Sequence, residues 1–441
     1  MNKQKWLSYA AENGFENFEI YQSLSRERTI SWYEGKMDTF VTSRVLGTAL
    51  RGMTEGKMAI MATEDADDAN MEKIISAMKA QAAAITSDDA GEILAPEKNE
   101  EVRTERCWKR PSQEEIETLL KKTEQAILAF DSRIIQVTDL EWSEETVQTE
   151  ITNSRGMEVR NERTMQVLVA GAAAQDGTEV KNDYSFEPVE DINAFDADAF
   201  VKELCEGVLE KLGASPIPSG TYPVILEKKA MTALFTAFSG MFSGDLIGKG
   251  ISPLKNSLDK EVFGSCVTVI DDPQNPKAPA VYNYDDEGHP AYRKTVVENG
   301  VFRTILHSTK SASRMNAEST GSGFKGSYSD AVSARPCNMS IEPGEKSLEE
   351  LYAEMKDGLV ITTFQGLHAG IDTVTTDFSL QCSGYLVKDG KKDRSVTLIT
   401  AAGNFLDLMK HVRCIGSDRE WKLRSITCPS ILFEGIAVSG E

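Results

Sequence analysis

The chain has 441 residues, of which 40% are hydrophobic and 27% are charged. This length exceeds what one ordinary hydrophobic core serves, and the composition is that of a globular rather than a disordered protein. The formal net charge is −21 and no Lys/Arg cluster is present that could bind phosphates, which argues against direct nucleic-acid binding.

The apolar runs and the cysteine spacing indicate where in the cell the protein is located. No run approaches the ~20 apolar residues of a membrane-spanning helix, and residues 1–11 lack the apolar core of a signal peptide. The seven cysteines are scattered without CxxC spacing, which argues against a disulfide scaffold or a zinc ribbon. We expect a cytoplasmic protein in which most cysteines are buried.

The first stretch of the chain predicts strands followed by a helix. Residues 18–21, 29–33 and 45–51 alternate in polarity as antiparallel strands do. Residues 65–86 read as a helix whose apolar face comprises Met71, Ile74, Ile75, Met78 and Ala82. The polar residues 87–111 then suggest a linker.

A second stretch of the chain, from residue 112 onward, also predicts strands and amphipathic helices. Ser112 is expected to cap a helix, with Glu115 completing a capping box. Period-two patterns predict strands at 134–140, 147–152, 158–171 and 179–186, and a helix at 196–212 closes the unit. The shared content of strands and amphipathic helices is compatible with a diverged internal repeat.

From residue 217 onward the chain is rich in strand signals. Residues 222–226 predict a strand, 229–241 a helix with many small residues, and 348–355 another helix. Asn299-Gly300 and Asp389-Gly390 lie between apolar runs, as two-residue hairpin turns do. The expected class is α+β, with strand-helix units at 1–100 and 101–216 and a β-rich C-terminal domain at 217–441.

Familiar catalytic motifs are weak or missing. The four histidines are isolated and none is followed by Glu, so no helix can present two His and a neighbouring Glu to a metal ion. Residues 321–326 match GxGxxG but lack the preceding buried strand and the following apolar helix of a dinucleotide site. We interpret them as a flexible Gly/Ser loop.

Several segments, in order, resemble the TldD/PmbA family of bacterial peptidases. Residues 233–245 resemble the family's metal-binding helix, which reads HExxxH and is followed by Gly-Asp. Counting back from Gly244-Asp245 puts Phe235 and Gly240 at the two His positions and Thr236 at the Glu position. The other segments with family-like sequence are 153–156, 267–273, 335–338, 375–379, 402–404 and 415–418. Thr376 stands where the family has Gly.

The resemblance also shows which metal ligands of the family's catalytic branch are absent from this chain, and their absence bears on its function. In the catalytic branch a Cys near the C-terminus completes the zinc site, and Cys428 occupies that position as a remnant ligand. A catalytic zinc needs three protein ligands and an open position, and Phe235 and Gly240 supply no donor atom. We therefore assign no catalytic residue, no metal and no cofactor to this chain, and place it in the PmbA/TldE branch.

Membership in that branch implies partners. We expect a heteromer with a zinc-bearing TldD-like subunit that hydrolyses unstructured peptides and takes part in peptide maturation, and a homodimer when the chain is alone. We expect no membrane and no direct nucleic-acid contact, although the family also carries the name modulator of DNA gyrase.

Two alternatives stay open. The chain could be a free-standing hydrolase with a different site, for which the titratable groups in family-like motifs are the candidates: Asp271, Asp272, Asp377, His368 and Arg335. Such a site needs these groups within hydrogen-bond reach of one substrate. The chain could also be an interaction protein that regulates DNA gyrase.

Overall fold

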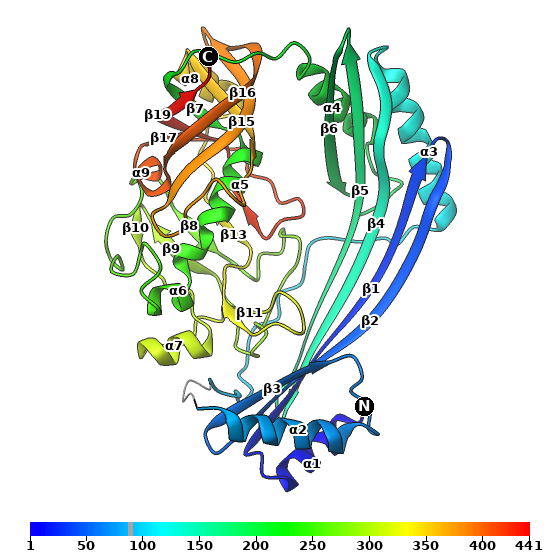
Figure 1. Ribbon diagram of the computed structural model, residues 1–441, viewed down its shortest axis with the longest axis vertical. Coiled ribbons are helices and arrows are strands. Elements are labelled where there is room, and N and C mark those ends of the chain that lie inside the picture. The colour runs from blue at the N-terminus through cyan, green and yellow to red at the C-terminus, as the bar shows by residue number, and fades with distance from the viewer. Residues whose placement is uncertain (87–90) are drawn as a thin grey trace.

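The computed structural model describes residues 1–86 and 91–441. Figure 1 shows a long curved sheet along one side of the molecule and a more compact C-terminal part beside it. The sheets are predominantly antiparallel and helices cover them, so the expected α+β class is confirmed.

One six-stranded sheet takes its strands from both predicted N-terminal units. Its strands lie in the order β3-β2-β1-β4-β5-β6. In chain order they are β1 (Asn17–Tyr33), β2 (Lys36–Thr54), β3 (Lys57–Thr63), β4 (Ile134–Asn153), β5 (Glu158–Asp176) and β6 (Glu179–Pro188). The central β1–β4 pairing runs antiparallel from Glu19↔Asn153 to Ser31↔Glu141 and joins the two units. The division into 1–100, 101–216 and 217–441 stays a prediction.

The strands are longer than the sequence pattern predicts. Residues 18–21 and 29–33 were expected as two strands, but both belong to β1. The mostly polar residues between them, 22–28, pair with β2 on one side and β4 on the other, so their backbone groups are satisfied without a buried face. Alternation of apolar residues therefore marks only the parts of a strand that lie over a core.

Helices cover the two ends of this sheet (Figure 1). At one end α1 (Lys3–Glu12) and α2 (Met71–Ala84) enclose a core around Trp6, Phe18 and Leu50. At the other end α3 (Gln113–Phe130) and α4 (Ala197–Glu210) enclose one around Trp142. The apolar face predicted for α2 is buried, and the capping box of Ser112 and Glu115 is present.

Helix α2 begins at Met71 rather than at Asp65 as expected. The carboxylate of Asp67 accepts hydrogen bonds from the backbone N–H groups of Ala69 and Asn70 at 2.9 Å. An Asp side chain that binds the backbone two and three residues ahead favours a turn over a helix. The helical pattern therefore starts only after this turn.

The predicted linker lies against the C-terminal part. Residues 87–90 of it are outside the described residues, and 91–111 form no helix or strand. Asn99 donates from its side chain to the carbonyl of Asn283 at 2.5 Å, and Arg106 donates to the carbonyl of Trp421 at 2.5 Å. This segment is therefore fixed to the body on which it lies.

The C-terminal part contains two larger sheets that share a core. The six-stranded one has the order β16-β15-β14-β7-β19-β17, and the five-stranded one has the order β10-β9-β8-β13-β18. The first is built from β7 (Gly220–Leu226), β14 (Gly358–Gln365), β15 (Asp377–Lys388), β16 (Lys391–Asn404), β17 (Val412–Ile415) and β19 (Ile431–Ser439). The second is built from β8 (Val269–Asp271), β9 (Lys294–Glu298), β10 (Val301–Phe302), β13 (Met339–Ile341) and β18 (Ile426–Thr427).

Helices of the C-terminal part fill and cover these sheets. Helix α5 (Lys228–Phe238) contributes Leu234, Phe235 and Phe238 to the core that both sheets share. Helix α8 (Leu348–Met355) covers the opposite face of the six-stranded sheet through Leu351 and Met355. The shorter helices are the 3₁₀ turn Ser239–Phe242, α6 (Gly244–Gly248), α7 (Thr309–Met315) and α9 (Phe405–Lys410).

The two predicted hairpin turns are confirmed. Asn299-Gly300 joins β9 to β10 and Asp389-Gly390 joins β15 to β16. All four residues have positive φ, between 47° and 83°, the conformation that Asn, Asp and Gly tolerate in two-residue hairpins.

The predicted flexible loop at 321–326 is wrong. Gly323 and Phe324 form β11, which pairs with β12 (Ser333–Ala334), and the run from Gly321 to Phe324 is buried. The backbone N–H of Gly323 donates to Asp285 at 2.9 Å and that of Lys325 donates to Asp286 at 2.8 Å. Hydrogen bonds to buried carboxylates thus hold residues 321–326 in place, although their Gly/Ser composition alone predicts a flexible loop.

None of the described helices is long and apolar enough to span a bilayer.

Candidate functional site

The residues that resemblance aligns with a metal motif lie at the end of α5. The helix stops at Phe238, and a 3₁₀ turn from Ser239 to Phe242 carries the chain on to α6. The hydroxyl of Ser239 donates back to the carbonyl of Thr236 at 2.8 Å. Phe235 and Thr236 are therefore on the helix, whereas Gly240 lies in the turn beyond it.

Phe235 is part of the hydrophobic core. Its side chain is 1% exposed, and its ring centroid lies 6.3 Å from that of Phe242 and 6.2 Å from that of Phe405. An aromatic side chain packed on several sides stabilises the fold by burial and offers no lone pair to a metal ion. At this position the residue has a packing role.

The two other motif positions are also without a base or a ligand. Thr236 is exposed, and its hydroxyl donates to the carbonyl of Thr232 at 2.6 Å, one helical turn earlier. A Cβ placed on Gly240 would meet Leu246 at 3.6 Å, an ordinary contact, so space does not require glycine there. A threonine hydroxyl engaged with its own helix does not replace a carboxylate as a proton acceptor.

Cys428 follows β18 and faces the same helix. It is fully buried, and its backbone N–H donates to the hydroxyl of Thr232 at 2.9 Å. Burial raises the pKa of the Cys428 thiol far above its usual range, with opposing contributions from hydrogen bonds to Ile341 and Thr232. Because a thiolate is the form that binds zinc, this environment favours the form that does not.

The candidates for a free-standing hydrolase are dispersed. Asp271 is buried on β8, whereas Asp377 begins β15 in the other sheet, and His368 and Arg335 are exposed. Across the described ranges, no hydrogen bond or ion pair links any two of the candidates Asp271, Asp272, Asp377, His368 and Arg335. The structure therefore does not assemble them into one acid–base site.

Asp271 has a different set of partners. Its Oδ2 lies 3.3 Å from Nζ of Lys294, and its Oδ1 accepts a hydrogen bond of 2.6 Å from the backbone N–H of Cys337. Lys294 also donates to the carbonyl of Thr320 at 3.1 Å. Burial raises the pKa of Asp271, with the charge of Lys294 acting against it. This arrangement connects β8, β9 and the 320–337 segment, and it indicates a structural ion pair.

A buried polar cluster joins the N-terminal sheet to the C-terminal part, and sequence reasoning missed it. Arg51 on β2 binds Glu19 on β1 at 2.7 Å and lies 3.6 Å from Glu287. Nearby, Tyr21 on β1 donates to Asp286 at 3.0 Å. The members on β1 and β2 are more than two hundred positions from Asp286 and Glu287, and the only local signal is the acidic run Asp285–Glu287.

Burial shifts the pKa of three carboxyl groups in this cluster upward. Burial raises the pKa of Glu19 and of Asp286, with Arg51 opposing the shift at Glu19. The pKa of Asp285 is raised well above its usual range, first by burial and then by the charge of Glu287. The cluster sits where two parts of the molecule meet, so we interpret it as a structural junction.

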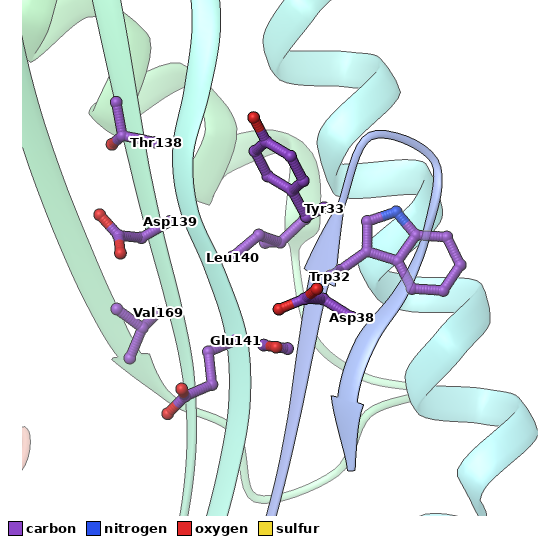
Figure 2. Close-up of a pocket in the computed structure, with 9 residues that line it drawn as sticks. Trp32, Tyr33, Asp38, Thr138, Asp139, Leu140, Glu141 and Val169 are labelled. Carbon is purple, nitrogen blue, oxygen red and sulfur yellow. The ribbon is translucent and has the colours of Figure 1, made fainter.

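A shallow cavity of about 240 Å³ lies at the far end of the N-terminal sheet. Figure 2 shows Asp139 and Glu141 on β4, with Tyr33 and Asp38 from the tip of the β1–β2 hairpin. Burial raises the pKa of Glu141, and the charge of Asp139 adds to the shift. Every lining residue lies on β1, β2, β4 or β5 of the N-terminal sheet, and none belongs to α5 or the turn after it.

Comparison with known proteins decides the family. Sequence models of the PmbA/TldA metallopeptidase match domain 1 at residues 18–82, the central domain at 106–212 and the C-terminal domain at 219–440. The chain belongs to the TldD/PmbA family. The resemblance inferred from the sequence motifs is thereby confirmed.

Relatives from both branches of the TldD/PmbA family are similar to this chain. The metalloprotease TldD homolog of Buchnera aphidicola (subsp. Schizaphis graminum) is 28% identical over 347 residues, which cover 73% of this chain and 71% of that protein. The metalloprotease PmbA of Escherichia coli O157:H7 is 25% identical over 331 residues, which cover 75% of this chain and 71% of that protein.

Solved structures of TldD/PmbA-like proteins share the whole fold. A candidate modulator of a DNA gyrase from Thermotoga maritima superimposes with a TM-score of 0.89 at 29% identity, over 99% of each chain. TldE from Thermococcus kodakarensis superimposes with a TM-score of 0.87 at 21% identity, over 99% of this chain and 100% of that one. At that identity the second comparison shows the fold alone.

The family's description as metallopeptidases implies a metal ion, and the residues at the end of α5 do not fit one. Phe235 and Gly240 have no donor atom, and Cys428 is buried with a thiol whose pKa is raised. No group of three or more His, Cys, Asp or Glu side chains in residues 1–86 and 91–441 is arranged to hold a metal ion. We derive no chemistry through a metal in this chain.

Proposed function

We propose that this chain is the zinc-free, PmbA/TldE-type subunit of a TldD-like metallopeptidase that acts on unstructured peptides in the cytoplasm. The observation that supports it is the position of Phe235, where a phenyl ring is buried against Phe242 and Phe405 in place of a ligand. Family membership supplies the peptidase context, and the missing donor atoms argue against zinc-dependent hydrolysis at this helix.

Two observations support a division of labour between subunits. The chain has the fold of the Thermotoga maritima protein over 99% of each chain, yet it lacks donor atoms at the positions aligned with the metal motif. A subunit of this kind contributes walls and contacts to a shared peptide chamber, while the partner supplies zinc and the activated water. The same complex would serve in the maturation of modified peptides.

Reconstitution tests this proposal. The chain, a TldD-like metallopeptidase and their mixture are each incubated with an unfolded peptide, and cleavage is followed by mass spectrometry with and without a chelator. We expect no chelator-sensitive cleavage by the chain alone and faster or altered cleavage by the mixture. Chelator-sensitive cleavage by the purified chain alone would contradict the assignment.

A second candidate function is suggested by a relative. The Thermotoga maritima protein at 29% identity is described as a candidate modulator of a DNA gyrase. With a net charge of −21, this chain would have to act on the enzyme rather than on its DNA. A supercoiling assay with purified gyrase and no other family member tests this: an effect of the chain would favour a regulatory role.

A further inference from the structure

The two faces of the N-terminal sheet differ in what lies against them. Side chains alternate between the faces along each strand. Ile30 belongs to the core under α3 and α4, whereas Ser31, its neighbour on β1, lies on the opposite face and is paired with Glu141 of β4. Tyr21 is an even number of positions from Ser31, so it shares that face, and it donates to Asp286 of the C-terminal part. The face with Ser31 and Glu141, here called the inner face, is therefore turned toward the C-terminal part.

Large aromatic and apolar side chains of the inner face are exposed. Val41 of β2 lies on this face because it is paired with Thr29 of β1. The pairings from Glu141 through β5 to β6 place Tyr184 on it as well. The exposed fractions of Tyr33, Val41 and Tyr184 are 43%, 55% and 66%. Exposed apolar side chains that gather on one face mark contact with another molecule.

Three carboxyl groups around the cavity of the N-terminal sheet have no counter-charge. Asp38, Asp139 and Glu141 all line this cavity. Within the described ranges, none of the three side chains forms an ion pair or accepts a hydrogen bond. By contrast, the next two acidic residues of β4, Glu144 and Glu145, each bind an arginine. The cavity therefore concentrates negative charge that the chain itself does not balance.

This cavity is suited to an organic cation. Its volume of about 240 Å³ lies below the ~300–1,000 Å³ of pockets that take whole drug-sized ligands, so it has room for one long side chain. In the described part of the chain, no three acidic, His or Cys side chains are arranged to hold a metal ion. Figure 2 shows Tyr33 among the lining residues, and its ring offers a face to an ammonium or guanidinium group. Burial and the charge of Asp139 raise the pKa of Glu141, and a bound cation would oppose that shift.

We propose that the inner face binds an extended basic segment of the peptide substrate, with a Lys or Arg side chain of that segment in the cavity between Asp38, Asp139 and Glu141. The inference rests on the proposed function, which supplies the unstructured peptide, and it adds the chemical class of that peptide. Residues that flank the basic one would lie against Val41 and Tyr184. Binding would cover these exposed side chains and supply the missing counter-charge. The net charge of −21 also attracts a basic segment and repels an acidic one.

Fluorescence anisotropy with two labelled peptides tests the charge requirement. One unstructured peptide has a central Arg, and the other has citrulline, a neutral isostere, at that position. We expect the Arg peptide to bind about tenfold more tightly or better. Asp139→Asn/Glu141→Gln should abolish this difference. The control Glu12→Gln/Glu72→Gln removes the same number of charges at the α1–α2 end of the sheet and should preserve it.

Free arginine amide separates a peptide site from a site for small amines. It should displace the Arg peptide only at concentrations far above the Kd of that peptide, because it has no flanking residues to contact Val41 and Tyr184. Displacement at concentrations near that Kd would overturn the proposal, since the cavity would then take the cation alone.

Photo-cross-linking gives a readout that does not depend on the variants. A peptide with a benzophenone group beside its Arg should label the inner face, within residues 31–41 or 167–184. Equal binding of the Arg and citrulline peptides, an equal loss in the control variant, or cross-links confined to other segments would each overturn the proposal and leave the proposed function standing. Chelator-sensitive cleavage by the chain alone would overturn the proposed function without changing these binding results.

Discussion

The backbone N–H of Cys428 donates to the Thr232 hydroxyl at 2.9 Å, which joins the end of β18 to helix α5. The thiol is therefore held in the core, where burial raises its pKa and closes access to reagents.

We predict that an aromatic disulfide reagent labels the exposed Cys107 and Cys266 in the native protein and spares Cys428. A buried thiol with a raised pKa presents almost no thiolate for attack. Peptide mapping by mass spectrometry before and after denaturation measures this, with unfolded protein as the control. Fast native labelling of Cys428 would show that the residue is accessible and still able to act as a ligand.

Phe235 should contribute far more to stability than its neighbour. We expect Phe235→Ala to lower the free energy of unfolding by about 3–5 kcal/mol, because the change opens a cavity among aromatic rings. Thr236→Ala, at the exposed adjacent position, should change it by less than about 0.5 kcal/mol. Urea unfolding monitored by circular dichroism compares the two. Similar effects from both variants would argue against the packing role.

The zinc content of the purified chain tests whether the missing donor atoms prevent metal binding. After incubation with zinc and removal of the excess, the purified chain should hold well below one zinc per molecule by plasma mass spectrometry. A zinc-bearing TldD-like peptidase treated in the same way is the positive control. Full occupancy that survives dialysis would mean that other side chains bind the metal, and their identity could be sought by substitution of the four histidines.

Thr376 offers a test of backbone strain. Its φ is 67°, a conformation that is unfavourable for a β-branched residue, and it stands where the family has glycine. Thr376→Gly and Thr376→Ala both remove the hydroxyl that donates to Asn404, but only glycine relieves the strain. We expect the Gly variant to be more stable than the Ala variant by about 1 kcal/mol. Thermal unfolding of the pair gives the difference.

The buried junction should make stability depend on pH. The pKa of Asp285 is raised in the fold, so its contribution to stability is fully present below the unfolded value of 3.8 and is lost as pH rises through the higher folded value. Glu287→Gln removes the second cause of the shift and should reduce this loss. Urea unfolding across that window compares the variant with the wild type. Parallel pH profiles would contradict the coupling between these two carboxyl groups.

The sequence predicted local features well because they depend on local chemistry. The capping box at Ser112, the hairpins at Asn299-Gly300 and Asp389-Gly390 and the buried face of α2 follow from propensities within a few residues. The alignment of Phe235 came from resemblance, and its burial could not be read from one sequence. The junction of Arg51, Glu19 and Glu287 was invisible because it depends on pairings between distant strands.

The β1–β4 pairing has a consequence for how the chain folds. Phe18 on β1 and Ser154 just after β4 are hydrogen-bonded although they are 136 positions apart, so the central ladder closes only after a long stretch has been synthesised. Contacts of high sequence separation slow folding. During translation β3 can pair with β2 soon after the β1–β2 hairpin forms, whereas the other edge of β1 stays unpaired until β4 has been synthesised.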